Sequence, residues 1–164
     1  MTEPAPLTAP LSTYRSAVIS EWVDYNGHLR DAYYLLLFSL ATDALMDQLG
    51  LGQAGRAATG HSLYTLECHI NFVQEVKLGQ QVEVRTQILG HDIKRLHLHH
   101  SLHLSGEAPM LAASEQMLLN VSTALARSAP FAEPVQRRVE ALALAHQALP
   151  APRFAGRAIS LVRS

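Results

Sequence analysis

The stretch that decides the fold is residues 16–50, which reads SAVISEWVDYNGHLRDAYYLLLFSLATDALMDQLG. Its first part, residues 16–23, is short and mostly apolar and is predicted to form a β-strand. Asp24 ends this segment, and Asn26-Gly27 close behind it is a strong turn signal. The stretch therefore begins with a strand that ends in a carboxylate and a turn.

The second part of the stretch, residues 32–49, is predicted to be a helix. Asp31 is expected to cap its start, and Gly50 is expected to end it. Apolar side chains run almost all the way round this helix, which is typical of a helix enclosed by other structure. The rest of the chain must therefore wrap it.

Alternating apolar and polar residues predict four strands after a glycine- and alanine-rich loop at residues 51–62. The strands cover residues 64–72, 81–89, 95–104 and 111–121. Turns around Gly79, Gly90 and Gly106 separate them. This pattern favours an antiparallel meander with one buried face.

The third of these strands is rich in histidine. Its leucines lie on one face and His97, His99 and His103 on the other, a spacing that leucine alternation explains without a metal site. We expect the histidine face to be solvated or to form an interface. His100 falls on the leucine face, where a buried imidazole needs a hydrogen-bond partner.

The order of these elements predicts an α+β protein with the hotdog fold: an antiparallel sheet of about five strands wrapped around a long central helix. Residues 131–147 add a peripheral helix. We expect a flexible N-terminal arm at residues 1–13, one hotdog domain at 14–150 and a tail at 151–164. Such a wrap leaves a sheet edge exposed, so a homodimer or homotetramer is expected, with the active site at a subunit seam.

Composition narrows the classes of function. The chain has 164 residues, of which 48% are hydrophobic, so it can build a core without disulfides or a metal. A net charge of −1 argues against a nucleic-acid partner. The single cysteine, Cys68, fits a reducing compartment. No targeting signal or membrane span is visible, so a soluble, cytoplasmic protein is expected.

Residues 21–34, EWVDYNGHLRDAYY, resemble the signature of the 4-hydroxybenzoyl-CoA thioesterase-like branch of the hotdog superfamily. The matching positions are Asp24, Gly27 and Tyr33-Tyr34, and the resemblance extends over about residues 16–125. It implies an acyl-CoA thioesterase with Asp24 as the nucleophile or general base. No cofactor is expected, because the sequence has neither a Gly-x-Gly-x-x-Gly motif after a strand nor a phosphate loop. Trp22 departs from the pattern, since many relatives have an acidic residue there.

The resemblance also implies roles for the surrounding residues. Gly27 and His28 join Asp24 in the catalytic group, and His28 either orients Asp24 or contacts the substrate. Donors for the oxyanion are expected from the backbone N–H groups of residues 29–32, which include Asp31, and from the loop of Gly60, His61 and Ser62. The expected pocket residues are Trp22, Tyr25, Asn26, Tyr33, Tyr64, Glu67 and His69. The cations expected to meet the CoA phosphates are Arg85, Lys94 and Arg95.

The motif, together with Glu67-Cys68-His69 and Lys94–His97, is similar to thioesterase domains of carnitine catabolism, which cleave betainyl-CoA. A quaternary ammonium favours an aromatic cage with a nearby carboxylate. Trp22, Tyr25, Tyr33, Tyr64 and Glu67 are candidates for such a cage. The same aromatic side chains are also suited to a core.

Other interpretations stay open. Asp24 before Asn-Gly is also common as a structural cap, and some hotdog branches place their carboxylate on the helix, where this chain has Asp43. We expect a structural role for Asp43. A hotdog hydratase or dehydratase matches poorly, because its pattern is Asp-x4-His with Asn-Pro and this chain has Asp24-x3-His28 with Asn26-Gly27. A non-catalytic acyl-CoA binding module is the remaining alternative.

Overall fold

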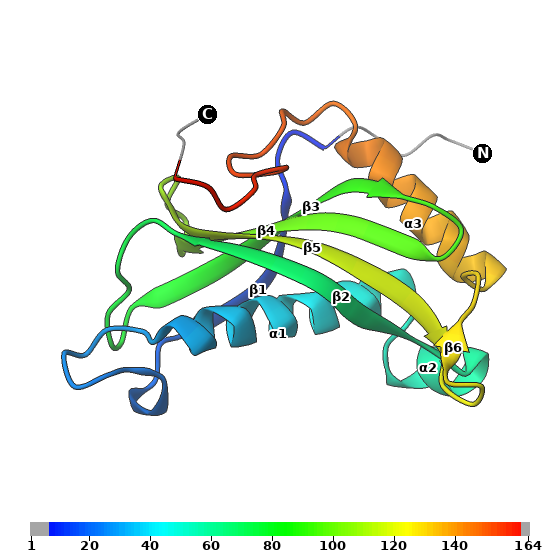
Figure 1. The fold of residues 1–164 in the computed structure, drawn as a ribbon, viewed down its shortest axis with the longest axis horizontal. Helices are drawn as coiled ribbons and strands as arrows, with labels where there is room; N and C mark the ends of the chain where they lie inside the picture. Colours follow the sequence, from blue (N-terminus) through cyan, green and yellow to red (C-terminus); the bar gives the residue numbers. More distant parts are fainter. Residues whose placement is uncertain (1–6, 162–164) are drawn as a thin grey trace.

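The computed structural model describes residues 7–161. An antiparallel sheet curls around one long helix, and its strand order is β1-β3-β4-β5-β2, with β6 paired to β5 (Figure 1). The strands are β1 (Leu11–Ala17), β2 (His61–Phe72), β3 (Gln81–His91), β4 (Arg95–Leu104), β5 (Met110–Ser122) and β6 (Arg127–Ser128). The helices are η1 (Ser20–Trp22), α1 (Asp31–Leu49), α2 (Gln53–Thr59) and α3 (Glu133–His146). This architecture confirms the predicted α+β class.

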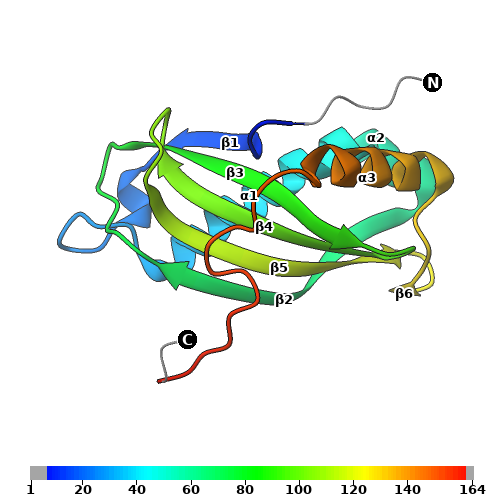
Figure 2. The ribbon, with the colours of Figure 1, turned by 90° about the horizontal axis from the view of Figure 1, so that it is seen from above.

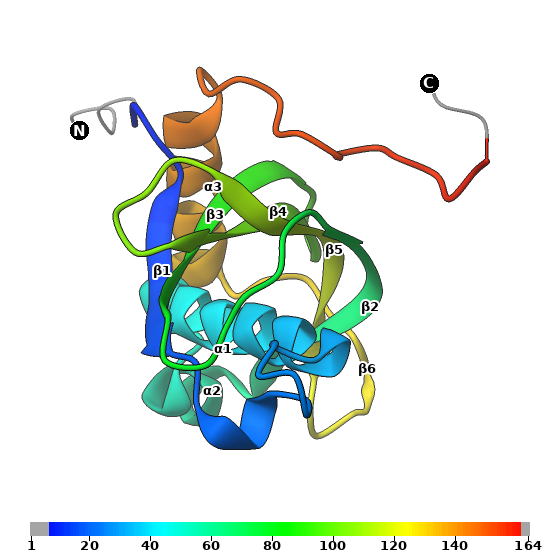
Figure 3. The same cartoon turned by 90° about the vertical axis from the view of Figure 1, so that its left-hand side faces the viewer.

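Helix α1 lies in the concave face of the sheet, as the end-on view shows (Figure 3). Gly50 ends it in the left-handed conformation at φ 80°, as predicted. The N-cap residue is Arg30 and not Asp31, which is already helical. Burial is one-sided: Leu37 and Phe38 are fully buried, whereas Leu35 and Leu36 are 43% and 36% exposed. The expectation of a fully enclosed helix is therefore wrong for the single chain.

The first strand lies earlier than predicted. It occupies residues 11–17 and so begins within the expected flexible arm 1–13, whereas η1 occupies residues 20–22 in the second half of the 16–23 segment. Residues 1–6 of that arm lie outside the described part. The predicted loop 51–62 contains the short helix α2, which its alanines favour.

The predicted meander is correct only for β3, β4 and β5. Strand β2 pairs with β5 and not with β3, so the chain crosses the end of the sheet between residues 72 and 81. The two edges of the sheet are therefore β1 and β2. This crossing brings the loop at residues 73–80 against the turn that follows η1.

His100 has the hydrogen-bond partners that its inward position demands. Its Nδ1 lies 2.8 Å from the Thr86 hydroxyl and its Nε2 lies 3.0 Å from the Thr42 hydroxyl. Its ring stacks on Phe38 at 5.8 Å between centroids. The imidazole thus ties β3 and β4 to α1, and burial lowers its pKa to about 3.

The outer face of the sheet is covered by α3 and by the chain that follows it (Figure 2). His99 lies 3.1 Å from the carbonyl of Arg153, and the N–H of Gly156 donates to Glu115 at 2.6 Å. His99 and His103 are only 2% and 6% exposed. The prediction of a solvated face is therefore wrong for these two histidines, because the tail contacts His99 through Arg153 and the carbonyls of Ala108 and Pro109 lie 3.0 Å from Nδ1 of His103.

Within residues 7–161, no single helix is long and apolar enough to cross a membrane. Helices α1 and α2 pass such a test only as a pair, by length and composition, and the chain bends by 61° between them. Eight residues of α1 are buried inside the protein.

Candidate active site

The turn after η1 holds Asp24 in a defined position. Its Oδ1 accepts the backbone N–H groups of Asn26 at 2.8 Å and His28 at 3.1 Å. Gly27 has φ 74°, a conformation that favours glycine. The hydrogen bond from the His28 N–H is the largest of the influences that lower the pKa of Asp24. The carboxylate is therefore held ionised, and both of these hydrogen bonds fall on Oδ1 and not on Oδ2.

Backbone hydrogen bonds hold this turn against the loop at residues 73–80. The N–H of Leu29 donates to Val76 at 2.7 Å, and the N–H of Leu78 donates to Gly27 at 2.9 Å. In this ladder His28 pairs with Lys77, and Glu75, two residues earlier in the loop, approaches the imidazole diagonally, with 3.3 Å between Glu75 Oε2 and His28 Nε2. Sequence reasoning missed Glu75, because only the crossing of the chain brings it to the turn.

The predicted oxyanion donors at the start of α1 are mostly engaged. The N–H groups of Leu29 and Arg30 already donate to backbone carbonyls, at 2.7 and 3.0 Å. The N–H of Ala32 donates to the Asp31 carboxylate at 2.8 Å. Of the four predicted N–H groups, that of Asp31 is the one left as a candidate.

The second predicted donor loop lies far from Asp24 in the same chain. Gly60 ends α2 and His61 begins β2 beyond the C-terminal end of α1, whereas Asp24 precedes the N-terminal end of α1 (Figure 1). A helix of 19 residues is about 28 Å long. One chain therefore does not bring Gly60, His61 and Ser62 to Asp24.

The predicted pocket residues separate into two groups. Trp22 and Tyr33 stack beside the turn, with ring centroids 6.2 Å apart. In the same turn, Tyr25 is 95% exposed and Asn26 is exposed. Tyr64, Glu67 and His69 lie on β2, and the last two line an outer cavity of about 270 Å³ with His97, Glu115 and the tail. A complete aromatic cage is therefore absent from the described part of one chain.

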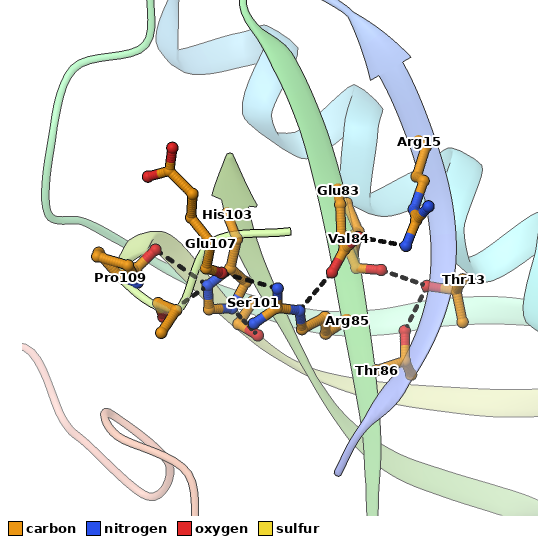
Figure 4. Close-up of polar contacts among 11 residues, drawn as sticks. Thr13, Arg15, Glu83, Val84, Arg85, Thr86, Ser101, His103, Glu107 and Pro109 are labelled. Atoms are coloured by element: carbon orange, nitrogen blue, oxygen red, sulfur yellow. Dashed lines mark hydrogen bonds and ion pairs between the residues drawn. The ribbon is translucent and has the colours of Figure 1, made fainter. Parts of the chain in front are cut away.

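The cations predicted to meet CoA phosphates have partners within the chain. Arg85 pairs with the Glu83 carboxylate and donates to the carbonyl of Glu107 at 2.7 Å (Figure 4). Arg95 pairs with Asp92 at 2.7 Å. Lys94 is partly exposed. Phosphate contacts by either arginine would have to compete with these ion pairs.

No group of three or more histidine, cysteine or acidic residues in the described chain is arranged to hold a metal. His97 pairs with Glu115 at 2.7 Å, and His103 lies 2.9 Å from the Ser101 hydroxyl (Figure 4). The spacing of these histidines is accounted for by strand alternation and by such partners.

Residues 18–139 match the model of the thioesterase-like superfamily. The chain belongs to this family. It is 64% identical to a betainyl-CoA thioesterase from Pseudomonas aeruginosa, over 92% of this chain and 95% of that protein. It is 42% identical to an L-carnitine dehydrogenase/betainyl-CoA thioesterase from Agrobacterium fabrum, over 94% of this chain but only 31% of that longer protein.

Solved structures agree with the family. A putative thioesterase from Pseudomonas putida is 53% identical, with a TM-score of 0.82 over 94% of this chain and 98% of that one. A hypothetical protein from Staphylococcus aureus in complex with CoA is 25% identical, with a TM-score of 0.86 over 96% of this chain and 100% of that one. The predicted hotdog fold, thioesterase family and thioester-hydrolase activity are confirmed.

Proposed function

We propose that this chain hydrolyses betainyl-CoA to the free acid and CoA, with Asp24 as the reacting carboxylate. The observation that carries the proposal is the turn that presents Asp24 ionised at the start of α1, beside the stacked pair of Trp22 and Tyr33. Both curated relatives described above have betainyl-CoA thioesterase in their names. The electron-rich faces of the two rings suit a quaternary ammonium.

The chemistry of the site uses Asp24 Oδ2 in one of two ways. As a nucleophile it forms a bond to the acyl carbon, and the C–S bond breaks with its electron pair on sulfur; water then releases the acid from the mixed anhydride. As a general base it takes a proton from the water that attacks the acyl carbon. In both routes the N–H of Asp31 donates to the thioester oxygen as it gains charge. No step needs a metal or a cofactor.

The second oxyanion donor is proposed to come from another copy of the chain. Strand β2 is an edge of the sheet, and apolar side chains beside that edge are exposed: Leu35, Leu36, Tyr64 and Leu66. Since α3 and the tail cover the outer face, a second copy fits best along β2 and α1. A two-fold axis there would reverse α1 and bring residues 60–62 of one copy to Asp24 of the other.

A homodimer is therefore the expected state in solution. Light scattering at micromolar concentration should give about twice the chain mass of 18.0 kDa. A species of the single-chain mass alone would contradict the shared site. Leu66→Glu, which puts a charge on the exposed edge, should shift the dimer toward that single-chain mass. Leu125→Glu, on an exposed side chain in the turn before β6, is the matched control.

Thiol release from a panel of acyl-CoA thioesters tests the substrate. We expect kcat/KM for betainyl-CoA to exceed that for acetyl-CoA by about tenfold or more, the range of a cation–π contact of 1–2 kcal/mol. Equal rates for the two would contradict betainyl specificity and leave a general thioesterase. Saturable binding without thiol release would contradict hydrolysis.

The cellular setting is a further part of the proposal. The one cysteine, Cys68, lies with its sulfur 3.3 Å from the Ser114 hydroxyl and is a free thiol. A free thiol and an acyl-CoA substrate are both in keeping with the cytoplasm. We propose that the protein acts there, on a small soluble thioester.

A further inference from the structure

We infer that Glu75 is a positioning residue for the reaction, which it assists by orienting the imidazole of His28 beside Asp24. The inference rests on the proposed hydrolase function and adds a residue to its site. It starts from the 3.3 Å approach of Glu75 Oε2 to His28 Nε2. A base held by a carboxylate next to a reacting group is a recurrent catalytic arrangement.

Backbone hydrogen bonds on both sides of His28 fix its segment relative to the loop that carries Glu75. On one side of His28, the N–H of Leu29 donates to Val76; on the other side, Gly27 accepts the N–H of Leu78. His28 and Lys77 form an isolated antiparallel bridge between these bonds. This register places Glu75 two residues before the bridge partner of His28, so its side chain reaches the imidazole diagonally, although it is 71% exposed.

The loop that carries Glu75 is itself anchored to the sheet. The N–H groups of Val73 and Gln74 both donate to the carbonyl of Leu111, at 2.9 and 3.0 Å. The hydroxyl of Tyr34, in the first turn of α1, lies 3.4 Å from the carbonyl of Gln74. The same segment thus contacts the helix start and the catalytic turn, so Glu75 belongs to the frame of the site.

The contact selects which nitrogen of His28 carries the proton. A neutral imidazole has one N–H, and the carboxylate of Glu75 holds that proton on Nε2, so Nδ1 is left as the acceptor. The charged neighbours of His28 are Asp24 in the same turn, Arg30 before α1, and Glu75 and Lys77 in the facing loop. The residue that donates its backbone N–H to Asp24 therefore also offers a base.

In the nucleophilic route, this base acts on the second step. Water adds to the acyl carbon of the mixed anhydride while Nδ1 of His28 accepts one of its protons, and the bond from that carbon to Asp24 breaks. The proton then passes from His28 to the CoA thiolate. Glu75 gains and loses no proton, and it keeps the ring aligned and stabilises the transient imidazolium.

The test compares the steady-state kinetics of Glu75→Gln with those of wild type. We expect kcat to fall about tenfold with KM unchanged, because substrate contacts are retained. Glu75→Asp should recover part of the loss. Glu107→Gln, an exposed carboxylate in the β4–β5 turn, is the matched control.

A double variant decides whether Glu75 acts through His28. In the His28→Asn background, Glu75→Gln should cause no further loss of kcat; a full second loss would overturn the inference. A wild-type kcat in Glu75→Gln would also overturn the inference, and the hydrolase function would still stand if Asp24→Asn is inactive. Absence of thiol release by the wild-type chain would instead contradict the proposed function.

Discussion

Asp24→Asn is expected to lower kcat by about 10²- to 10⁴-fold, the range for loss of a positioned general base. The substitution keeps the size of the side chain but replaces the anionic Oδ2 with an amide nitrogen, which neither attacks a thioester nor accepts a proton from water. Substrate should still bind, because the stacked rings of Trp22 and Tyr33 are untouched. The measurement is thiol release under saturating and limiting substrate, which separates kcat from KM.

The fold should survive this substitution. The amide oxygen of asparagine can still accept the N–H groups of Asn26 and His28, so the turn retains its hydrogen bonds. We expect a melting temperature close to that of wild type. Asp43→Asn is the matched control, because Asp43 is exposed on α1. If Asp24→Asn keeps more than about a tenth of the wild-type rate, the loss is smaller than that expected for a general base and the assignment is contradicted. If Asp43→Asn is inactive instead, the reacting carboxylate lies on α1.

The elements that sequence reasoning predicted well are those with a strong period. Alternation of apolar residues predicted β3, β4 and β5 to within a few residues, because one face of each packs on α1. Strand β1 was misplaced, since the segment at 16–23 is apolar for a different reason: Val18 packs in the core and Trp22 against it without pairing as a strand. The place of β2 at the sheet edge depends on a crossing that local pattern does not encode.

The candidate site was predictable only where it is local. The turn of Asp24, Gly27 and His28 is specified by neighbouring residues, and the structure builds it from their own backbone bonds. Glu75 reaches the same turn through tertiary pairing, which no spacing in the sequence reveals. The loop of residues 60–62 lies at the opposite end of α1, so in the proposed site it reaches Asp24 only from a second copy.

The histidines also show what local sequence pattern can and cannot predict. Their burial leads to a second prediction, a strong dependence of stability on pH. Sequence reasoning predicted a partner for His100, since strand alternation put it inside the core. It did not predict that the tail would contact His99, or that the β4–β5 turn would contact His103, on the outer face. Four histidines are less than 7% exposed in the described structure, and burial lowers the pKa of each: His99, His100, His103 and His146.

We therefore expect the free energy of unfolding to fall steeply as pH decreases below 6.5. The unfolded chain binds a proton at each of these histidines near pH 6.5, whereas the folded chain does not, so acid favours unfolding. For His100, with a folded pKa of about 3, the loss is about 1.4 kcal/mol per pH unit, or about 2 kcal/mol between pH 6.5 and 5. The other three histidines act in the same direction.

The pH window separates the histidines from the carboxylates. Asp92, whose pKa is lowered to about 2 chiefly by the backbone N–H of Lys94, affects stability only below its ordinary value of 3.8. Urea unfolding between pH 7.5 and 5, at one protein concentration, therefore reports the histidines. His100→Asn, which keeps a donor and an acceptor, should reduce the slope by about one proton, whereas His91→Gln, at an exposed position, should not. A change of less than about 1 kcal/mol across this window, which is below the loss expected from His100 alone, would show that these histidines protonate in the folded protein.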